Sequence, residues 1–364
     1  MYATRQEIRR AAGHSIICGF AAKSLDAELK EILREVGPLG LILFARNVES
    51  PAQVAELGRE LKLHKPDAKL LLTVDQEGGR VQRIRKPATE WPAMRLLGKV
   101  DDLVLTEKVG AALGRELRAM NFDVDFAPVL DVDTNSKNPV IGDRSFAPNP
   151  QQVAAHGIAL TTGLQKVGVA ACGKHFPGHG DTDLDSHKAL PKVSHELSRL
   201  REVEWVPFAA TIKAGLSSIM TAHVVVEALD PDHPATLSRK ALSPLREDMK
   251  FEGVVVSDDL EMKAVADHYR VEQMAVMGSG AGVDVFLACN KPEVIVGLHR
   301  ALVLAAEKRE IRHDDLLAAE TRATTWRDRF YASPVAPSQV KTIVGCGSHL
   351  TLAQEIEERA AQLV

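Results

Sequence analysis

The chain has few cysteines, no excess of charge of one sign and no long apolar run. Its four cysteines form no CxxC pair and no zinc-like spacing, and Cys18, Cys172 and Cys289 fall inside short apolar runs. This pattern disfavours a disulfide scaffold and a cysteine-rich zinc module, and it favours buried thiols in a reducing compartment. No segment approaches the ~20 apolar residues that span a bilayer. We therefore expect a cytoplasmic protein.

The charge balance also limits the kinds of partner. The formal net charge is −4 at pH 7, which offers no electrostatic footprint for nucleic acid or for an anionic membrane surface. With 45% hydrophobic and 26% charged residues, the chain has the balance of a globular protein with a full core. We expect neither nucleic acid nor a membrane as a partner.

Apolar runs and helical patterns alternate along the chain. Eight short runs are near-continuously apolar, as expected of parallel strands that are covered on both faces. They span residues 15–20, 39–44, 70–74, 124–130, 167–172, 218–223, 253–257 and 283–288. Between the first two runs, the helical pattern from Leu25 to Val36 can be capped by Ser24 and stopped by Gly37. A second helix can begin after Ser50.

Eight strands separated by helices, with no polar linker between them, predict an α/β fold, a single (β/α)8 TIM-type barrel. We expect residues 1–331 to form the catalytic barrel. Residues 332–364 should form a helical tail that packs on the barrel or on a partner. A doubly wound sheet is the main alternative, and it is disfavoured because no GxGxxG or P-loop motif follows an early strand.

Polar residues stand at the ends of most apolar runs. In such a barrel the loops at the carboxyl ends of the strands form the active site. The residues at these positions are Arg46, Asn47, Asp75, Asp131, Lys174, His175, His223, Asp258, Asp259 and Asn290. Carboxylates, imidazoles and cations in one barrel mouth suit bond cleavage in a polar, hydroxylated substrate.

Asp258 directly follows the seventh run. A carboxylate that a strand holds rigidly suits attack on an electrophilic carbon, because orientation replaces much of the entropic cost. The alternative is that Asp258 or Asp259 caps a helix beginning at Leu260. We expect Asp258 to be functional and Asp259 to be mainly structural.

The fifth run leads into KHFPGHGDTDLDSH at 174–187, which is too polar and varied for core and reads as a catalytic loop. Asp185 can orient and polarise His187, which can then donate and accept a proton near neutral pH. The alternative for His187 is an exposed loop histidine. Lys174 and His175 can bind sugar hydroxyls or an acyl oxygen.

Two further polar residues lie in glycine-containing loops. Asp75 precedes Gly78 and Gly79, so its carboxylate can accept two hydroxyl protons from a ligand or form an Asx turn. Arg144 follows a Gly-Asp turn, and it can be a ligand clamp or a salt bridge that ties the loop down. We favour the ligand role for both.

Four motifs, in this order, resemble glycoside hydrolase family 3, in particular its bacterial β-N-acetylglucosaminidase branch, which recycles peptidoglycan fragments. The motifs are DQEGGRV at 75–81, GDRSF at 142–146, KHFPGHG at 174–180 with DSH at 185–187, and SDDL at 257–260. The resemblance spans roughly residues 15–310. The short tail is typical of this branch, which lacks the second domain of many family 3 β-glucosidases.

The resemblance implies a role for each matching residue. Asp258 would be the nucleophile, His187 the acid/base catalyst and Asp185 the residue that orients His187. The N-acetylglucosamine ring would be bound by Asp75, Arg83, Arg144, Lys174 and His175. The family needs no cofactor and no metal, and we expect a monomer or a weak homodimer.

The implied reaction is hydrolysis with retention of configuration through a covalent glycosyl-enzyme. The expected substrate is a muropeptide fragment that carries terminal non-reducing β-linked N-acetylglucosamine. In the family this is N-acetylglucosamine joined to 1,6-anhydro-N-acetylmuramic acid, with or without peptide.

Three alternatives stay open. A metal-dependent barrel hydrolase could use His175, His179, His187, Asp185 and Asp258, although no HxH or HExxH spacing supports it. A glycoside phosphorylase is the second, because a neutral imidazole at the acid/base position repels phosphate less than a carboxylate does. The third is a sugar-binding barrel without turnover.

Overall fold

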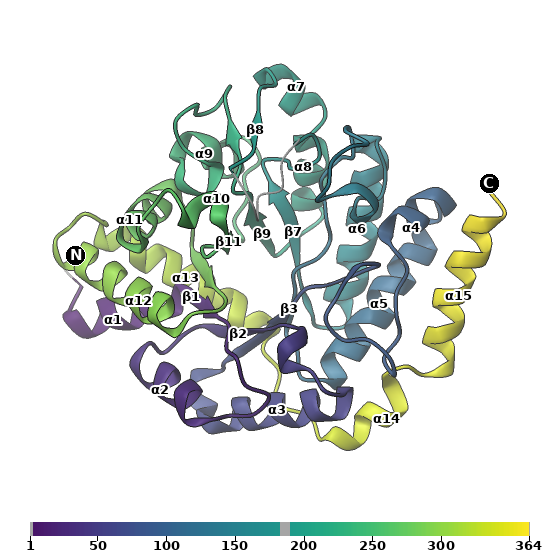
Figure 1. Cartoon of the computed structure of the whole chain (residues 1–364), viewed down its shortest axis with the longest axis horizontal. Helices are drawn as coiled ribbons and strands as arrows, with labels where there is room; N and C mark the ends of the chain where they lie inside the picture. The colour runs from purple at the N-terminus through teal and green to yellow at the C-terminus, as the bar shows by residue number, and fades with distance from the viewer. Residues whose placement is uncertain (1–2, 183–189, 364) are drawn as a thin grey trace.

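The computed structural model describes residues 3–182 and 190–363. Eight parallel strands close into a barrel in the order β1-β12-β11-β9-β7-β6-β3-β2. Figure 1 looks along the barrel axis and shows the helices surrounding the strands. The barrel strands are β1 (Ile16–Cys18), β2 (Gly40–Leu43), β3 (Leu71–Val74), β6 (Val124–Asp125), β7 (Ala170–Phe176), β9 (Ser218–Thr221), β11 (Val254–Asp259) and β12 (Val285–Ala288). The predicted single (β/α)8 barrel is confirmed.

Helices cover the outside of the barrel. They are α1 (Arg5–His14), α2 (Ala27–Glu35), α3 (Pro51–His64), α4 (Met94–Val100), α5 (Leu103–Ala119), α6 (Pro150–Lys166), α7 (Leu197–Glu202), α8 (Trp205–Lys213), α9 (Arg239–Glu247), α10 (Lys263–Ala266), α11 (Val271–Ala281), α12 (Pro292–Glu307), α13 (His313–Phe330), α14 (Val340–Ile343) and α15 (Gly347–Ala361). Two small sheets lie outside the barrel. One pairs β8 (Lys192–Val193) with β10 (Val225–Val226), and the other pairs β4 (Gln76–Gly78) with β5 (Val81–Gln82).

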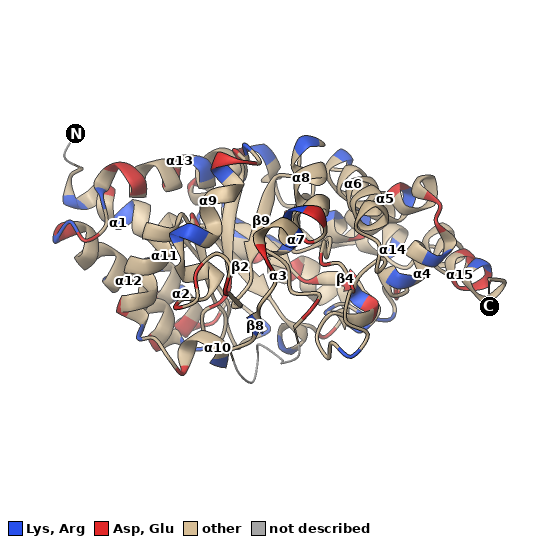
Figure 2. Ribbon diagram, turned by 90° about the horizontal axis from the view of Figure 1, so that it is seen from above, with Lys and Arg blue, Asp and Glu red and all other residues tan. Residues whose placement is uncertain are grey.

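The strands are buried on both faces, which explains their continuously apolar sequences. All residues of β2, β3, β9 and β12 are buried. The inward-facing residues of the barrel pack into one cluster that also includes Ala323, Trp326 and Phe330 of α13. Figure 2 shows α13 on the opposite side of the barrel from α10 and β8. Helix α13 therefore covers the amino-terminal end of the barrel and leaves the carboxyl-terminal end for the site.

Several predicted boundaries were wrong for identifiable reasons. Helix α2 is capped by Asp26, whose side chain accepts a hydrogen bond from the backbone N–H of Leu29 at 2.9 Å, and not by Ser24. The predicted strand 124–130 keeps regular pairing only at Val124–Asp125, because Pro128 has no N–H to donate to a ladder. The predicted Ser50 cap of α3 is confirmed.

The barrel strands β7 and β11 run further than predicted. The sequence predicted that β7 ends at residue 172 and β11 at residue 257. In the structure β7 continues through Lys174 and His175 to Phe176, and β11 continues through Asp258 to Asp259. The strand predictions followed apolar runs, so the polar residues at the ends of β7 and β11 were assigned to loops. These strands therefore carry candidate site residues directly.

The C-terminal tail packs against the barrel wall, and Figure 1 shows α15 beside α4 and α5. The division of the chain at residue 331 stays a prediction. None of the described helices is long and apolar enough to cross a membrane.

Candidate active site

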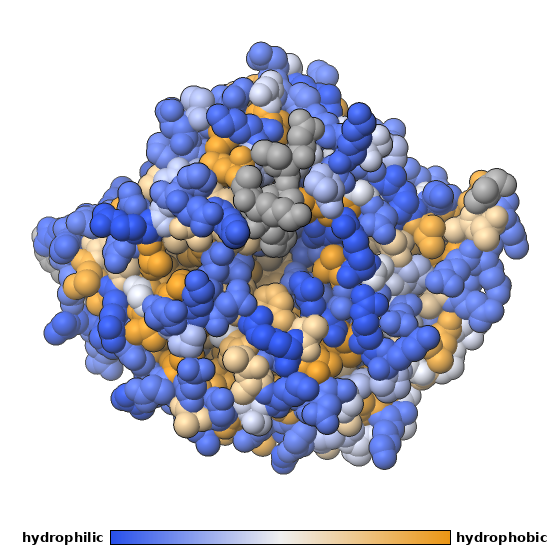
Figure 3. All heavy atoms as spheres, viewed as in Figure 1, coloured by the Kyte–Doolittle hydropathy of each residue, from blue (hydrophilic) through white to orange (hydrophobic). Residues whose placement is uncertain are grey.

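A pocket of about 410 Å³ opens at the carboxyl-terminal end of the barrel. Figure 3 views this face and shows hydrophilic side chains gathered around its centre. The pocket is lined by Ile42, Phe44, Arg46, Asp75, Glu77, Val81, Arg83, Val140, Arg144, Lys174, His175, His179, Met220, Asp258, Asp259, Met262, Leu287, Cys289 and Asn290. It therefore brings together Asp75, Lys174, His175 and Asp258, which the sequence placed in one barrel mouth, with Arg83 and Arg144, which the family resemblance implied.

Asp75 stands directly after β3 and pairs with two cations. Its Oδ1 lies 2.8 Å from Nζ of Lys174, and its Oδ2 lies 3.1 Å from Nη2 of Arg83. Burial opposes ionisation of this carboxyl group, but Lys174 and Arg83 outweigh burial and hold the pKa of Asp75 below its usual value. Asp75 is therefore an ionised acceptor at the floor of the pocket.

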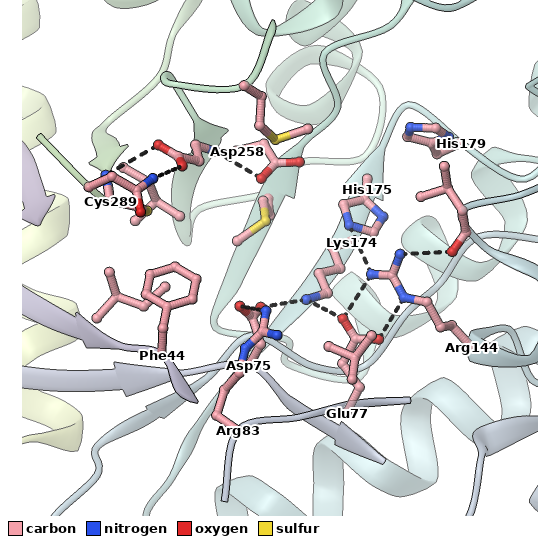
Figure 4. A pocket seen from close by; sticks show the side chains of 18 of the residues that line it. Phe44, Asp75, Glu77, Arg83, Arg144, Lys174, His175, His179, Asp258 and Cys289 are labelled. Atoms are coloured by element: carbon pink, nitrogen blue, oxygen red, sulfur yellow. Dashed lines mark hydrogen bonds and ion pairs between the residues drawn. The ribbon is translucent and has the colours of Figure 1, made fainter. Parts of the chain in front are cut away.

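Glu77 lies between Lys174 and Arg144, and the sequence analysis did not single it out. Its Oε1 is 2.6 Å from Nζ of Lys174 and 2.8 Å from Nη2 of Arg144, and its Oε2 is 2.8 Å from Nε of Arg144. The residue is 2% exposed. Despite burial, the two cations hold the pKa of Glu77 well below its usual range, so the cluster stays ionised. Figure 4 shows these contacts.

His175 is held by a second buried carboxylate, that of Asp131. His175 Nδ1 lies 2.7 Å from Oδ2 of Asp131, and the backbone N–H of His179 donates to the other carboxylate oxygen at 2.7 Å. Nε2 of His175 lies 3.4 Å from Nη2 of Arg144. Burial, followed by the proximity of His175, lowers the pKa of His179 to about 4. His179 is therefore a neutral ring beside His175.

Asp258 and Asp259 end β11, and their side chains have different surroundings. Asp258 Oδ1 accepts a hydrogen bond from the backbone N–H of Asp259 at 2.8 Å. No hydrogen bond within the described part of the chain reaches its other oxygen. Figure 4 shows Asp258 across the pocket from Glu77. Asp258 thus presents a carboxylate oxygen on the wall opposite the cation cluster.

Asp259 supports the backbone around it. Its Oδ1 accepts the backbone N–H groups of Glu261 at 3.1 Å and Cys289 at 3.2 Å. Burial, reinforced by the charges of Glu261 and Asp258, raises the pKa of Asp259 to about 7. The alternative of a helix cap before Leu260 is wrong, because α10 begins at Lys263.

Phe44 forms part of the pocket wall, and its ring lies between the side chains of two arginines. The guanidinium carbons of Arg46 and Arg83 lie 4.6 and 5.3 Å from the centre of its ring. These cation–π contacts hold the Phe44 ring and the two guanidinium groups next to one another. Three predicted strand-end residues do not line the pocket. Asp131 pairs with His175, His223 is buried against Thr236, and Asn47 caps a turn at Phe44.

Asp185 and His187 lie outside the described residues. Within residues 3–182 and 190–363, no group of three His, Cys, Asp or Glu side chains is placed to hold a metal ion. The missed residue Glu77 left a signal in the sequence, because it stands two positions after Asp75 within DQEGGRV. Asp131 was among the predicted strand-end residues, and the structure places it behind His175.

Known proteins resemble the chain in both sequence and structure. The model of the glycosyl hydrolase family 3 N-terminal domain matches residues 14–325. A β-hexosaminidase of Nitrosomonas eutropha is 44% identical over 262 residues, which cover 70% of this chain and 74% of the relative.

Two solved structures extend the likeness. A family 3 β-N-acetylglucosaminidase from Paenibacillus sp. str. FPU-7 superposes with a TM-score of 0.93 at 36% identity, over 97% of this chain and 68% of the other. NagZ from Neisseria gonorrhoeae, solved with N-trifluoroacetyl-D-glucosamine, gives a TM-score of 0.80 at 33% identity, over 95% and 98% of the two chains. The same NagZ has also been solved with a zinc ion. The chain therefore belongs to glycosyl hydrolase family 3 and is a glycoside hydrolase of the β-N-acetylhexosaminidase group.

Proposed function

We propose that the protein is a retaining exo-β-N-acetylglucosaminidase that releases terminal non-reducing N-acetylglucosamine from peptidoglycan fragments. The observation that carries the proposal is the pocket itself. Asp258 offers a carboxylate oxygen on one wall, and Asp75, Lys174, Arg144 and His175 line the facing side. A carboxylate nucleophile opposite hydroxyl-binding groups is what attack on the anomeric carbon of a sugar requires.

In the proposed reaction, an Asp258 oxygen forms a bond to the anomeric carbon while the bond to the aglycone oxygen breaks. Protonated His187, oriented by Asp185, gives its proton to the departing oxygen. Neutral His187 then takes a proton from water, and that water displaces Asp258 from the sugar. The roles of His187 and Asp185 are supported by the DSH motif and by family membership.

The sugar-binding residues have distinct tasks in this proposal. Asp75 is an ionised acceptor for sugar hydroxyl protons, and Arg83 holds it in place. Lys174 and Arg144 present N–H groups from the opposite side of the same cluster, and His175 contacts Arg144 there. Sugar hydroxyls both donate and accept hydrogen bonds, so a pocket with both kinds of partner suits them.

The decisive experiment is incubation with 4-nitrophenyl N-acetyl-β-D-glucosaminide beside the corresponding glucoside, with mass spectrometry of the quenched enzyme. We expect preferential cleavage of the N-acetylglucosaminide and a transient adduct on the peptide that contains Asp258. Asp258→Ala should abolish turnover while the chain stays folded by circular dichroism. Full activity of Asp258→Ala would overturn the assignment of the nucleophile.

The same assay separates the alternatives. Sugar 1-phosphate formed in phosphate buffer would indicate a phosphorylase, and activity lost to a chelator and restored by zinc would indicate metal-dependent hydrolysis. Saturable sugar binding without any cleavage would indicate a binding protein. A purified N-acetylglucosamine–anhydro-N-acetylmuramic acid disaccharide, compared with chitobiose, tests the peptidoglycan substrate. A cytoplasmic location and a monomer or weak homodimer stay predictions.

A further inference from the structure

We propose that Glu77 is the positioning residue of the sugar-binding cluster, which aims the last free N–H groups of Lys174 and Arg144 at the substrate. This inference rests on the proposed function and adds to it a residue that acts through other residues. Glu77 touches both cations and, in this proposal, does not touch the sugar.

The backbone leaves Glu77 little freedom. Glu77 lies in β4, and Gly78 follows it with a φ of +99°. A Cβ atom at Gly78 would lie 2.7 Å from the carbonyl oxygen of Pro92, so the chain passes too close for any other residue. On the other side, the N–H of Gln76 donates to Asp125 at 2.9 Å. The backbone on both sides of Glu77 is thus held in place.

Three separate parts of the chain meet at this carboxylate. Lys174 comes from β7, Arg144 from the turn Gly142–Arg144, and Glu77 from β4. Arg144 makes a bidentate pair with Glu77, with both N···O distances at 2.8 Å. Bidentate pairing fixes the plane of a guanidinium group as well as its position. Glu77 therefore sets the relative placement of two binding groups on different elements.

A count of donors shows what the pairing leaves for a ligand. An ammonium group has three N–H donors; Lys174 donates one to Asp75 at 2.8 Å, and its Nζ forms an ion pair with Glu77 at 2.6 Å. Asp75 and Glu77 together fix the position of the Lys174 ammonium group. In Arg144, Nε and Nη2 are occupied by Glu77 and His175, and Nη1 donates one hydrogen to Val140 at 3.1 Å. Among contacts with the described residues, Arg144 keeps one N–H of Nη1 and Lys174 keeps at least one for a ligand, and the other contacts of each cation hold it in place.

The charge of Glu77 also keeps Lys174 protonated. Burial and the charge of Arg144 both favour the neutral amine, whereas Asp75 and Glu77 favour the ammonium and raise its pKa above the usual range. Among the described residues, the titratable and charged groups around Lys174 are Asp75, Glu77, Asp125, Arg83, Arg144, Cys172 and His175. Without the Glu77 carboxylate, less negative charge would offset the repulsion between the positive charges of Lys174 and Arg144.

The test is Glu77→Gln, which keeps the shape of the side chain and removes its charge. The measurement is the dissociation constant of N-acetylglucosamine by calorimetry, from neutral to alkaline pH. This sugar is uncharged, so a pH dependence reports on the protein. We expect affinity at neutral pH to fall by about 10- to 100-fold. We expect a further loss at alkaline pH, because the pKa of Lys174 falls when one of its two carboxylate partners is removed. Under saturating aryl glycoside, kcat should change much less than KM.

Asp284→Asn is the matched control. Asp284 is 1% exposed and pairs with Arg246 and Arg322 at 2.8 and 2.7 Å, but it lies at the amino end of β12, away from the pocket. It should lose stability without changing sugar affinity or its pH dependence. If both variants weaken sugar binding alike and neither shows the alkaline loss, Glu77 is only a structural residue.

A second variant covers the case in which Glu77→Gln does not fold. Glu77→Asp keeps the charge but is one methylene shorter, so it cannot reach both cations. It should bind N-acetylglucosamine more weakly than the wild type at every pH, without the alkaline loss. Unchanged affinity in either variant overturns the inference. A wild-type protein that cleaves no N-acetylglucosaminide contradicts the proposed function instead, so the two failures are distinguishable.

Discussion

At the scale of single residues, Asp259 links pH to stability. Its pKa is about 7 in the folded chain against an ordinary value of 3.8, so between these values the folded state binds more protons than the unfolded state. The contribution of Asp259 to the free energy of unfolding is therefore lost as pH rises. The slope is up to about 1.4 kcal/mol per pH unit in that window. We expect the stability difference between wild type and Asp259→Asn to move in favour of the variant from pH 4 to pH 7. Urea titrations at several pH values measure the free energy of unfolding of both proteins. Parallel pH profiles of the wild type and the variant would contradict the prediction.

His187 is predicted to matter most when the leaving group is poor. If it protonates the departing oxygen, His187→Ala should reduce kcat/KM by about 10²- to 10⁴-fold for a natural disaccharide. An activated aryl glycoside needs little protonation, so its first step should be affected far less. The two substrates are compared in one buffer. Equal losses on both would count against His187 as the acid.

Residue identities were predictable where chemistry and position coincide. Asp75, Lys174 and Asp258 were found because polar residues interrupt apolar runs at a barrel mouth. Glu77 was missed because its function is set by two cations that come from other elements. No local sequence pattern indicates that Lys174 and Arg144 both contact Glu77.

At the scale of elements, the loop that follows β7 is pressed against the chain near Asp131. A Cβ atom on Gly180 would lie 1.8 Å from the carbonyl oxygen of Val132, and Asn138 Nδ2 donates to the carbonyl of Gly180 at 3.0 Å. We expect Gly180→Ala to destabilise the fold by about 1–3 kcal/mol, because the loops must separate. It should also weaken sugar binding, since His179 and Asp131 move with them.

Gly297→Ala is the control for this prediction. Gly297 lies within α12, and a Cβ atom added there would meet no atom of the described residues within 4 Å apart from its chain neighbours and the backbone of its own helix. The change should stabilise the fold by up to about 1 kcal/mol, because alanine favours helix. Thermal unfolding of both variants decides the matter. Equal effects of the two substitutions would show that the close approach at Gly180 is unimportant.

Element existence was predictable from burial, but element ends were not. All eight strands were found because strands covered on both faces are apolar throughout. Lys174 and Asp258 escaped the strand pattern because they point into the pocket, where polar side chains are paired or face the cavity. Pro128 interrupts the regular ladder of the fourth barrel strand, a local effect that a run of apolar residues conceals.

At the scale of the whole molecule, Glu116 joins the C-terminal tail to the barrel wall. This buried carboxylate of α5 accepts hydrogen bonds from Thr89 Oγ1 at 2.6 Å, from the N–H of Gly345 at 2.9 Å and from His349 Nδ1 at 2.8 Å. Glu116→Ala should cost about 3–5 kcal/mol, because it leaves these groups without their shared acceptor. Cleavage by trypsin within 332–346 should also accelerate.

Glu357→Ala is the matched control on the tail. Glu357 is exposed on α15, so its loss should leave both the denaturation midpoint and the cleavage rate near those of the wild type. If Glu116→Ala behaves in the same way, the tail is held by other contacts.

Barrel closure was predictable from the number and order of strands. The sequence left open whether the tail packs on the barrel or on a partner, because the residues that hold it lie far away in the chain.

The packing of Ala323, Trp326 and Phe330 against the barrel interior has a consequence for how ligands enter and leave. Side chains fill the barrel below the pocket, so in the proposed reaction substrate and product must share one entrance at the carboxyl-terminal end of the barrel.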